Sequence, residues 1–456
     1  MIKSISILGF RGYGEKQKVD FALPNGTTGS GLSFLVGANN SGKTSIIEAI
    51  RAFNGHPNET PSFSVGKRNS KADDRVEISM EDEAGKICVI KTVESGGSST
   101  TKMPNQSHST YVLQSRRFVD YEFSQGEQSR EQYLNSSNKL DNRRTSQLNN
   151  FYLRLFSIQN NKVQFDNMLR KILGSEIDWT IDQNDNGTYF IKVTFNGMSH
   201  SSEGLGDGIW SVFTICDAIY DSTEEDTIII DEPELSIHPS IQKRLMSVLT
   251  DQAKTKQIIL STHSPYFVDW ESISNGANLI RTTKETCGDI SCYTLSDEIK
   301  RKFTGIITDI NNPHVLGLNA NEVFFLDDKI ILVEGQEDIV IFKKISDELG
   351  RNFNGSFFGW GVGGAAKMIA FLKLFSDLGY KKVVAIYDGD KKSDMETDQK
   401  DFPEYEFVSL STDDIRDKDE RIIQRKIGLT NTKGKLKEDY REIANGLIDD
   451  INKYLE

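Results

Sequence analysis

The stretch that decides the fold is Gly37-Ala38-Asn39-Asn40-Ser41-Gly42-Lys43-Thr44. It follows an apolar run at 32–36 and opens a segment, 43–53, with helical periodicity. The spacing fits G-x-x-x-x-G-K-[ST], in which glycines let backbone N–H groups wrap a phosphate chain at a helix N-terminus. We therefore predict an ATP site whose ligands are Gly37, Asn39, Asn40, Ser41, Gly42, Lys43 and Thr44. Lys43 is expected to reach the β- and γ-phosphates, and Thr44 to coordinate Mg²⁺.

A second apolar run, 227–230, ends in the carboxylates Asp231 and Glu232. Its residues are β-prone, which predicts a buried strand. Beside a phosphate loop, the first carboxylate typically holds Mg²⁺, mostly through water, and the second orients or deprotonates the attacking water. Acidic residues also end strands without any catalytic role. The phosphate loop upstream favours the catalytic interpretation, with Asp231 as a metal ligand and Glu232 as the base.

Two later apolar runs also end in acidic residues. One ends at Glu334, with Asp338 four residues further on, and the other ends at Asp388 and Asp390. In a parallel α/β sheet the carboxyl ends of neighbouring strands meet at one edge, so we expect these side chains to converge. Oxygen ligands without His or Cys suit Mg²⁺ or Mn²⁺. The alternative is an α/β domain whose acidic loops bind no metal.

Length and charge limit the classes of protein that fit. The chain has 456 residues and a formal net charge of -13. The length predicts two domains. The negative charge alone argues against nucleic-acid binding, although it leaves room for a local basic track. Because no apolar run approaches the roughly 20 residues of a membrane span and the N-terminus lacks a signal peptide, we expect a cytoplasmic protein that contacts no membrane.

The pattern along the chain predicts an α/β protein in two parts. We expect a P-loop ATPase domain at 1–300, interrupted by a Gln/Asn-rich helical insertion at about 120–175. A linker at 301–320 then leads to a second α/β domain at 321–456 with a parallel sheet. The four cysteines are too few and too scattered for a disulfide framework.

The first domain resembles ABC-type ATPases of the SMC and OLD (overcoming lysogenization defect) kind. The resemblance rests on the motifs above, on Ser202-Glu203-Gly204-Leu205-Gly206 before a helix, and on His263 after the apolar run 257–260. It implies that Ser202 and Gly204 face the ATP of a second subunit and that His263 is a switch histidine. The chain is therefore expected to form a homo-oligomer through its ATPase domain. The signature departs from L-S-G-G-Q at Glu203 and Leu205.

The second domain resembles the Toprim domain of topoisomerases, primases and OLD nucleases, a Rossmann-like parallel sheet. Glu334-Gly335-x-x-Asp338 followed about 50 residues later by Asp388-x-Asp390 carries this resemblance. It implies catalytic roles for Glu334, Asp388 and Asp390, with Asp338 as a further metal ligand. Gly363-Gly364 opens a helix that fits the family, and Asp413-Asp414-Ile415-Arg416-Asp417 lies where the family places Asp-Ile-Glu-Asp.

Together the motifs resemble the OLD family of nucleases over essentially the whole chain. The resemblance implies an ATP-regulated, metal-dependent DNA endonuclease of bacterial anti-phage defence. Associated partners would be a reverse transcriptase with its RNA–DNA product, as in retrons, or a helicase, as in Gabija systems. The alternative is a non-cleaving, ATP-gated DNA clamp or sensor of the SMC type. A topoisomerase does not fit, because no separate breakage domain with a transesterifying tyrosine fits the remaining length.

Overall fold

The computed structural model divides the chain into two units, Met1–Thr294 and Leu295–Glu456. It describes residues 1–54, 60–93, 100–103, 110–115, 151–159, 162–195, 197–201, 205–285, 287–307, 328–359, 361–418 and 426–456. Each unit is considered by itself. None of the helices within these ranges is long and apolar enough to cross a membrane.

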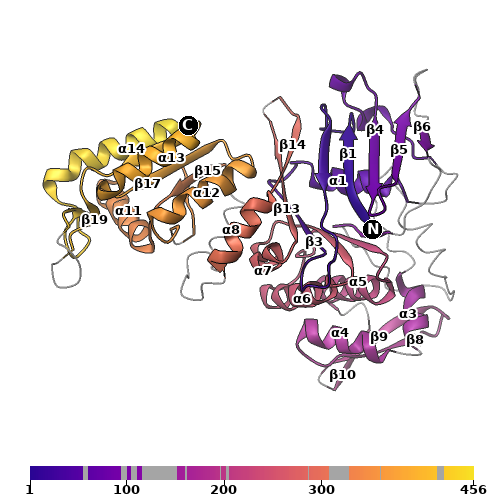
Figure 1. Ribbon diagram of the computed structural model, residues 1–456. Helices are drawn as coiled ribbons and strands as arrows, with labels where there is room; N and C mark the ends of the chain where they lie inside the picture. The colour runs from indigo at the N-terminus through magenta and orange to yellow at the C-terminus, as the bar shows by residue number, and fades with distance from the viewer. Residues whose placement is uncertain are drawn as a thin grey trace. The chain divides into compact units, whose positions relative to one another are not determined.

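The first unit is built on a six-stranded sheet in the order β14-β13-β3-β12-β11-β7 (Figure 1). Its strands are β3 (Leu32–Val36), β7 (Thr110–Leu113), β11 (Thr227–Asp231), β12 (Gln257–Ser261), β13 (Asn278–Lys284) and β14 (Ile290–Thr294). All neighbours run parallel except β14, which pairs antiparallel with β13 at one edge. Every residue of β3, β11 and β12 is buried, as expected for strands covered on both faces.

A second, antiparallel sheet in the first unit has the order β2-β1-β4-β5-β6. Its strands are β1 (Ile2–Leu8), β2 (Gln17–Asp20), β4 (Glu77–Asp82), β5 (Ile87–Thr92) and β6 (Thr100–Met103), with the short 3-10 helices η1 (Val65–Lys67) and η2 (Ser70–Ala72) before β4. Helix α1 (Lys43–Arg51) packs against β1, β7 and β11. It therefore joins the two sheets, and Ile46, Ile47 and Ile50 contribute to one buried core between them.

The helices of the first unit include α5 (Asp207–Asp221), which packs on β7 and β11, and α6 (Pro239–Gln252). The 3-10 helix η4 (Pro265–Phe267) and α7 (Trp270–Ser274) follow β12. The predicted insertion at about 120–175 is described only from 151, because 116–150 lie outside the described residues. There α3 (Phe151–Gln159) and α4 (Val163–Leu173) precede an antiparallel sheet of β8 (Asp178–Gln183), β9 (Tyr189–Phe195) and β10 (Met198–Ser201). Helix α4 packs across α5 and α6.

The second unit contains a four-stranded, all-parallel sheet in the order β16-β15-β17-β18. The strands are β15 (Lys329–Leu332), β16 (Ser356–Phe357), β17 (Lys382–Tyr387) and β18 (Glu406–Ser409). Ile331, Val384 and Ile386 form one core with helices α11 (Gln336–Leu349) and α14 (Arg441–Leu455). The alternate residues point to the other face, where α12 (Ala365–Asp377) packs on β17.

Two α-helices, two 3-10 helices and a small sheet complete the second unit. They are α8 (Asp297–Ile307), η6 (Gly389–Lys391), α13 (Lys392–Asp401), the strand pair β19 (Asp414–Arg416) and β20 (Gly428–Thr430), and η7 (Glu438–Tyr440) before α14. Helix α8 packs on α12, and it occupies the start of the segment expected to be a linker, 301–320. The rest of that segment, from residue 308, lies outside the described residues.

Candidate functional sites

The phosphate loop connects β3 to α1 through a tight backbone path. Gly37 and Gly42 adopt φ angles of 140° and 106°, and Asn40 adopts 64°. A Cβ atom on Gly37 would lie 2.2 Å from the carbonyl oxygen of Thr282, so the neighbouring strand β13 excludes a side chain there. The loop therefore places its backbone N–H groups at the start of α1, which is the arrangement that binds phosphate.

Lys43 is folded over this loop. Its ammonium group donates to the carbonyl oxygens of Gly37 at 2.9 Å and Ala38 at 3.1 Å. Burial lowers the pKa of Lys43 to about 8, although the carboxylates of Asp231 and Glu232 oppose that shift. The ammonium group therefore lies between neutral carbonyls and these carboxylates, and a phosphate chain would be a further anionic partner for it.

The two predicted carboxylates lie beside the loop. The hydroxyl of Thr44 donates to Asp231 at 3.3 Å, so the two expected Mg²⁺ ligands are already neighbours. Burial raises the pKa of Asp231 to about 6. Glu232 follows with a φ angle of 50°, an uncommon conformation for a non-glycine residue, and its N–H donates to Ser261 at 2.7 Å. Strained backbone of this kind is frequent at functional sites.

His263 follows β12, the strand that lies between β3 and β11. The strand order therefore brings it out between the phosphate loop and Glu232, and its Nε2 atom lies 4.0 Å from Glu232 Oε1. Burial, together with the charge of Lys43, lowers the pKa of His263 to about 4. The imidazole is therefore neutral near pH 7 and can serve as a hydrogen-bond donor or acceptor beside the candidate base.

A cavity of about 290 Å³ opens next to these groups, and the wall opposite Asp231 and Glu232 is formed by side chains of α1. Arg11 pairs there with Glu48 at 2.5 Å. The amide of Gln114, a residue considered for contact with the nucleotide, lies against the guanidinium of Arg51 when its oxygen faces that group. Sequence reasoning missed Glu48, because a mid-helix glutamate carries no motif of its own.

The predicted signature residues Ser202 and Gly204 lie outside the described residues, so their placement stays a prediction. Helix α5 begins shortly after them, at Asp207, with Gly206 in an extended conformation. A helix following the predicted signature is present as expected.

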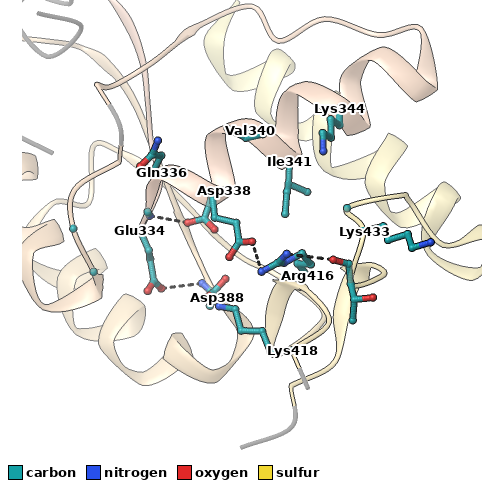
Figure 2. Close-up of a pocket in the computed structure, with 16 residues that line it drawn as sticks. Glu334, Gln336, Asp338, Val340, Ile341, Lys344, Asp388, Arg416, Lys418 and Lys433 are labelled. Atoms are coloured by element: carbon teal, nitrogen blue, oxygen red, sulfur yellow. Dashed lines mark hydrogen bonds and ion pairs between the residues drawn. The ribbon is translucent and has the colours of Figure 1, made fainter. Parts of the chain in front are cut away.

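In the second unit, Glu334 and Asp388 lie at the carboxyl ends of the adjacent parallel strands β15 and β17. The N–H of Asp388 donates to Glu334 Oε1 at 3.0 Å, which fixes one carboxylate against the neighbouring strand end (Figure 2). Asp338 accepts from the N–H of Gly335 at 2.7 Å at the start of α11. The N–H groups of Gly363 and Gly364 both donate to the carbonyl of Glu334 at 2.8 Å, so that glycine loop steadies the end of β15.

These carboxylates are crowded. Burial raises the pKa of Asp388 to about 8, and the charges of Asp414, Asp338 and Glu334 raise it further. Burial likewise raises the pKa of Asp338 to about 7, with Asp414 and Glu334 adding to the shift. Burial also raises the pKa of Glu334. Burial and neighbouring negative charges make the ionised form of these carboxyl groups unfavourable. A nearby cation would stabilise that ionised form.

Lysines pair with two acidic residues of this region. Asp390 pairs with Lys426 at 2.6 Å, while its charge also raises the pKa of Glu334, and Lys426 lies 3.6 Å from the buried Asp414. Asp414 is further paired with Lys418. No group of three or more His, Cys, Asp or Glu side chains in the described ranges is arranged to hold a metal ion as it stands.

A groove of about 730 Å³ runs past Glu334, Asp338 and Asp388. Four cationic side chains also line it, as Figure 2 shows, and they are Lys344, Arg416, Lys418 and Lys433. The polar lining further includes Gln336, Glu337 and Thr432. Arg416 reaches Glu337 at 2.5 Å. The segment with Lys433, Lys435 and Lys437 forms a turn after β20, because Asn431 accepts from the backbone N–H groups of residues 433 and 435.

Asp417 ends the acidic segment 413–417. It accepts from the N–H of Gly428 at 2.8 Å and pairs with Lys437 at 2.6 Å. It therefore fastens β19 to the following strand. The lysines of this region, Lys344, Lys418 and Lys426, were missed because their contacts depend on tertiary packing and follow no local spacing.

Comparison with known proteins supports both domain assignments. Residues 1–168 match the family described as AAA ATPase domain, and 196–269 match a second AAA domain family. Residues 325–390 match the family described as overcoming lysogenization defect protein-like, TOPRIM domain. Domains of these types generally use ATP and divalent metal ions.

Three relatives illustrate the similarity. The Old nuclease of Escherichia phage P2 is 31% identical over 28% of this chain and 22% of its own length. The endonuclease GajA of Bacillus cereus (strain VD045) is 25% identical over 45% of this chain and 34% of its own length. The Septu protein PtuA of Bacillus thuringiensis is 25% identical over 54% of this chain and 69% of its own length.

The chain thus spans about a third or less of the length of the first two relatives, and about two thirds of the third. The chain therefore joins an ATPase domain of the AAA type to a Toprim domain of the overcoming-lysogenization-defect type.

Proposed function

We propose that this protein is an ATP-regulated, divalent-metal-dependent DNA endonuclease that acts in bacterial defence against phage. The observation that carries the proposal is the groove of the second unit, in which Glu334, Asp338 and Asp388 share a surface with Lys344 and Lys433. Metal-dependent cleavage of a phosphodiester requires carboxylates that bind the metal ion and cationic groups that bind the phosphates, and this groove contains both.

The carboxylates fit Mg²⁺ or Mn²⁺, which prefer oxygen ligands. Glu334 and Asp388 would hold the ion, with Asp338 as a third ligand and Asp390 joining when it leaves Lys426. When bound, such an ion stabilises the attacking and leaving oxygens of the phosphodiester. Glu334 stays oriented through the N–H of Asp388, and its position next to the ion suits it to move a proton to or from the attacking water.

The lysines of the groove account for DNA binding by a chain with a net charge of -13. Lys344 on α11 and Lys433 in the turn after β20 are both exposed to solvent and line the groove. Contacts of this kind go to phosphates, so they position the strand without reading its sequence.

In the first unit, Lys43 and the loop N–H groups would bind the phosphates, Thr44 and Asp231 would hold Mg²⁺, and Glu232 would activate water beside the neutral His263. Ser202 and Gly204 of a second copy would complete the site, so we propose a homo-oligomer formed through the ATPase domain. A reverse transcriptase or helicase partner stays a prediction of the resemblance.

The test is cleavage of supercoiled plasmid in Mg²⁺ or Mn²⁺. We expect the wild-type protein to nick the plasmid, and Asp388→Ala to abolish nicking while ATP hydrolysis continues. Glu396→Ala, at an exposed position on α13, is the matched control and should cut normally. In the first unit, Glu232→Gln should keep ATP binding and stop turnover.

The alternative is a DNA clamp or sensor that binds DNA under ATP control without cutting. A clamp would leave the plasmid supercoiled in either metal, for the wild-type protein as well as for every variant. Normal cutting by Asp388→Ala would instead reject the assignment of the cleavage site to the Toprim groove.

A further inference from the structure

The short loop after Glu232 is tied to the loop that carries His263 by a single side chain, Glu234. One carboxylate oxygen of Glu234 accepts from the hydroxyl of Thr262 at 2.8 Å. The other accepts from the backbone N–H of His263 at 2.6 Å. Because each oxygen holds a different donor, the carboxylate fixes the peptide that joins Thr262 to His263 in both position and orientation.

The tie is part of a closed ring of hydrogen bonds. The Thr262 hydroxyl accepts from the N–H of Ser264 at 3.0 Å, and the Ser264 hydroxyl donates to Gln242 on α6 at 2.6 Å. The Gln242 amide returns to the starting loop by donating to the carbonyl of Ile237 at 2.7 Å. Since the ring begins and ends in segment 234–237, that segment and residues 262–264 are held as one body.

The members of this ring are shielded from water. Thr262 is 0% exposed, and Gln242 and Ser264 are each 8% exposed. Hydrogen bonds in such surroundings are stronger than those on the surface, and losing one partner leaves the other unsatisfied. In the same loop, Glu232 and Ser236 have φ angles of 50° and 63°, so the loop is held in a conformation that its residues rarely adopt alone.

We propose that Glu234 is the positioning residue that sets His263 relative to Glu232. Glu234 lies two residues after Glu232 and binds the backbone N–H of His263 directly. Its carboxylate therefore sets the distance of 4.0 Å between His263 Nε2 and Glu232 Oε1. The carboxylate of Glu234 binds Thr262 and the backbone of His263, and its charge also raises the pKa of Lys43 against the effect of burial. A shift of its loop, where Leu235 is 42% exposed, would be transmitted to His263.

The proposal predicts loss of restraint at His263 when Glu234 is changed. In Glu234→Gln an amide replaces the carboxylate, and its NH₂ group cannot accept from the His263 N–H while its oxygen accepts from Thr262. We expect faster backbone amide exchange in the peptide covering residues 257–266, measured by hydrogen exchange with mass spectrometry on the full chain. Glu225→Gln, at an exposed position before β11, should leave that exchange unchanged.

A kinetic test of the role of Glu234 rests on the ATP hydrolysis proposed above. Glu234→Gln should lower kcat about tenfold, as small misplacements of catalytic groups do, with the Kd for ATP within about twofold of wild type. Combining Glu234→Gln with His263→Ala should cost no more than His263→Ala alone, because Glu234 acts through His263. A residue that merely stabilises the fold would give additive losses.

Several outcomes would overturn the proposal. Unchanged amide exchange at 257–266 in Glu234→Gln is one, and additive effects on kcat in the double variant are another. If Glu234→Gln does not fold, Thr262→Val removes the second anchor with little change of shape, and the same two measurements decide. If wild-type protein binds ATP without hydrolysing it, the proposed ATPase fails, while the exchange experiment still decides the role of Glu234.

Discussion

The two candidate sites are built on opposite principles. In the first unit the groups expected to handle ATP are already fastened: Lys43 donates to two loop carbonyls, and Thr44 donates to Asp231. In the second unit the charges of Asp414, Asp338 and Glu334 add to the raised pKa of Asp388, and lysines pair with Asp390 and Asp414. In the first site, backbone geometry and hydrogen bonds already position the groups. In the second site, the carboxylates repel one another, and a bound cation would relieve that repulsion.

Replacement of Lys43 should give the largest change in ligand affinity. It tests whether the site of the first unit depends on groups that are already positioned. In Lys43→Ala the loop keeps its glycines but loses the buried cation, so we expect ATP binding to weaken by about 100-fold, the loss typical of a buried charge partner. The measurement is the Kd of ATP by isothermal titration calorimetry. Lys86→Ala, at an exposed position with no role in the loop, should bind ATP normally.

The same variant sharpens the contrast between the units. Binding of Mn²⁺ by the Toprim carboxylates should be unchanged in Lys43→Ala, because it depends on Glu334, Asp338 and Asp388. Mn²⁺ binding that fell together with ATP binding would mean that the two sites are not independent, and the comparison would have to be abandoned.

A change of pH should have an intermediate effect on metal affinity. It tests whether repulsion between carboxylates governs the site of the second unit. The carboxyls of Asp338 and Asp388, with pKa values of about 7 and about 8, must lose their protons to hold a metal ion. Mn²⁺ affinity should therefore rise about tenfold between pH 6 and pH 8.5, as followed by electron paramagnetic resonance. The variant Asp388→Asn should bind weakly throughout and show a flatter profile.

Stability of the metal-free protein should change with pH in the opposite sense. A carboxyl with a folded pKa above its unfolded value of about 4 holds its proton better in the folded state. Its contribution to stability is complete below pH 4 and is lost as pH rises through 7 to 8. We expect Mg²⁺ to restore stability most strongly at the upper end of this range. A metal effect that is equal at pH 6 and pH 8.5 would contradict the assignment.

The contrast between the sites also explains what could be predicted from the sequence. The phosphate loop is local: eight consecutive residues contain the glycines, the lysine and the threonine. In the structure Lys43 folds over this loop, and Thr44 donates to Asp231. The strand-end positions of Glu334 and Asp388 follow from the rule for parallel sheets. The phosphate loop and the strand-end carboxylates can each be predicted because they depend only on one strand or helix and the element next to it.

The remaining contacts could not be predicted, because they join elements distant in sequence. Lys426 reaches Asp390 from beyond β19, and no spacing rule connects them. The bonds from Glu234 to Thr262 and His263 depend on β11 and β12 being neighbours, which the sequence alone does not say. A shared role of Asp390 and Glu334 at a metal ion stays a prediction, since Asp390 pairs with Lys426 and its charge also raises the pKa of Glu334.

Replacement of Lys426 should have the smallest effect, and it asks whether that lysine competes with the metal. In Lys426→Gln, Asp390 and Asp414 lose an ammonium partner at 2.6 Å and 3.6 Å. Because a partly exposed ion pair is worth little, we expect Mn²⁺ affinity to rise only about threefold. Lys435→Gln, in the exposed turn after β20, is the matched control and should bind Mn²⁺ like wild type. Weaker binding in Lys426→Gln would mean that the lysine orders Asp390 for the metal, and the second site would then be prepared by geometry as the first one is.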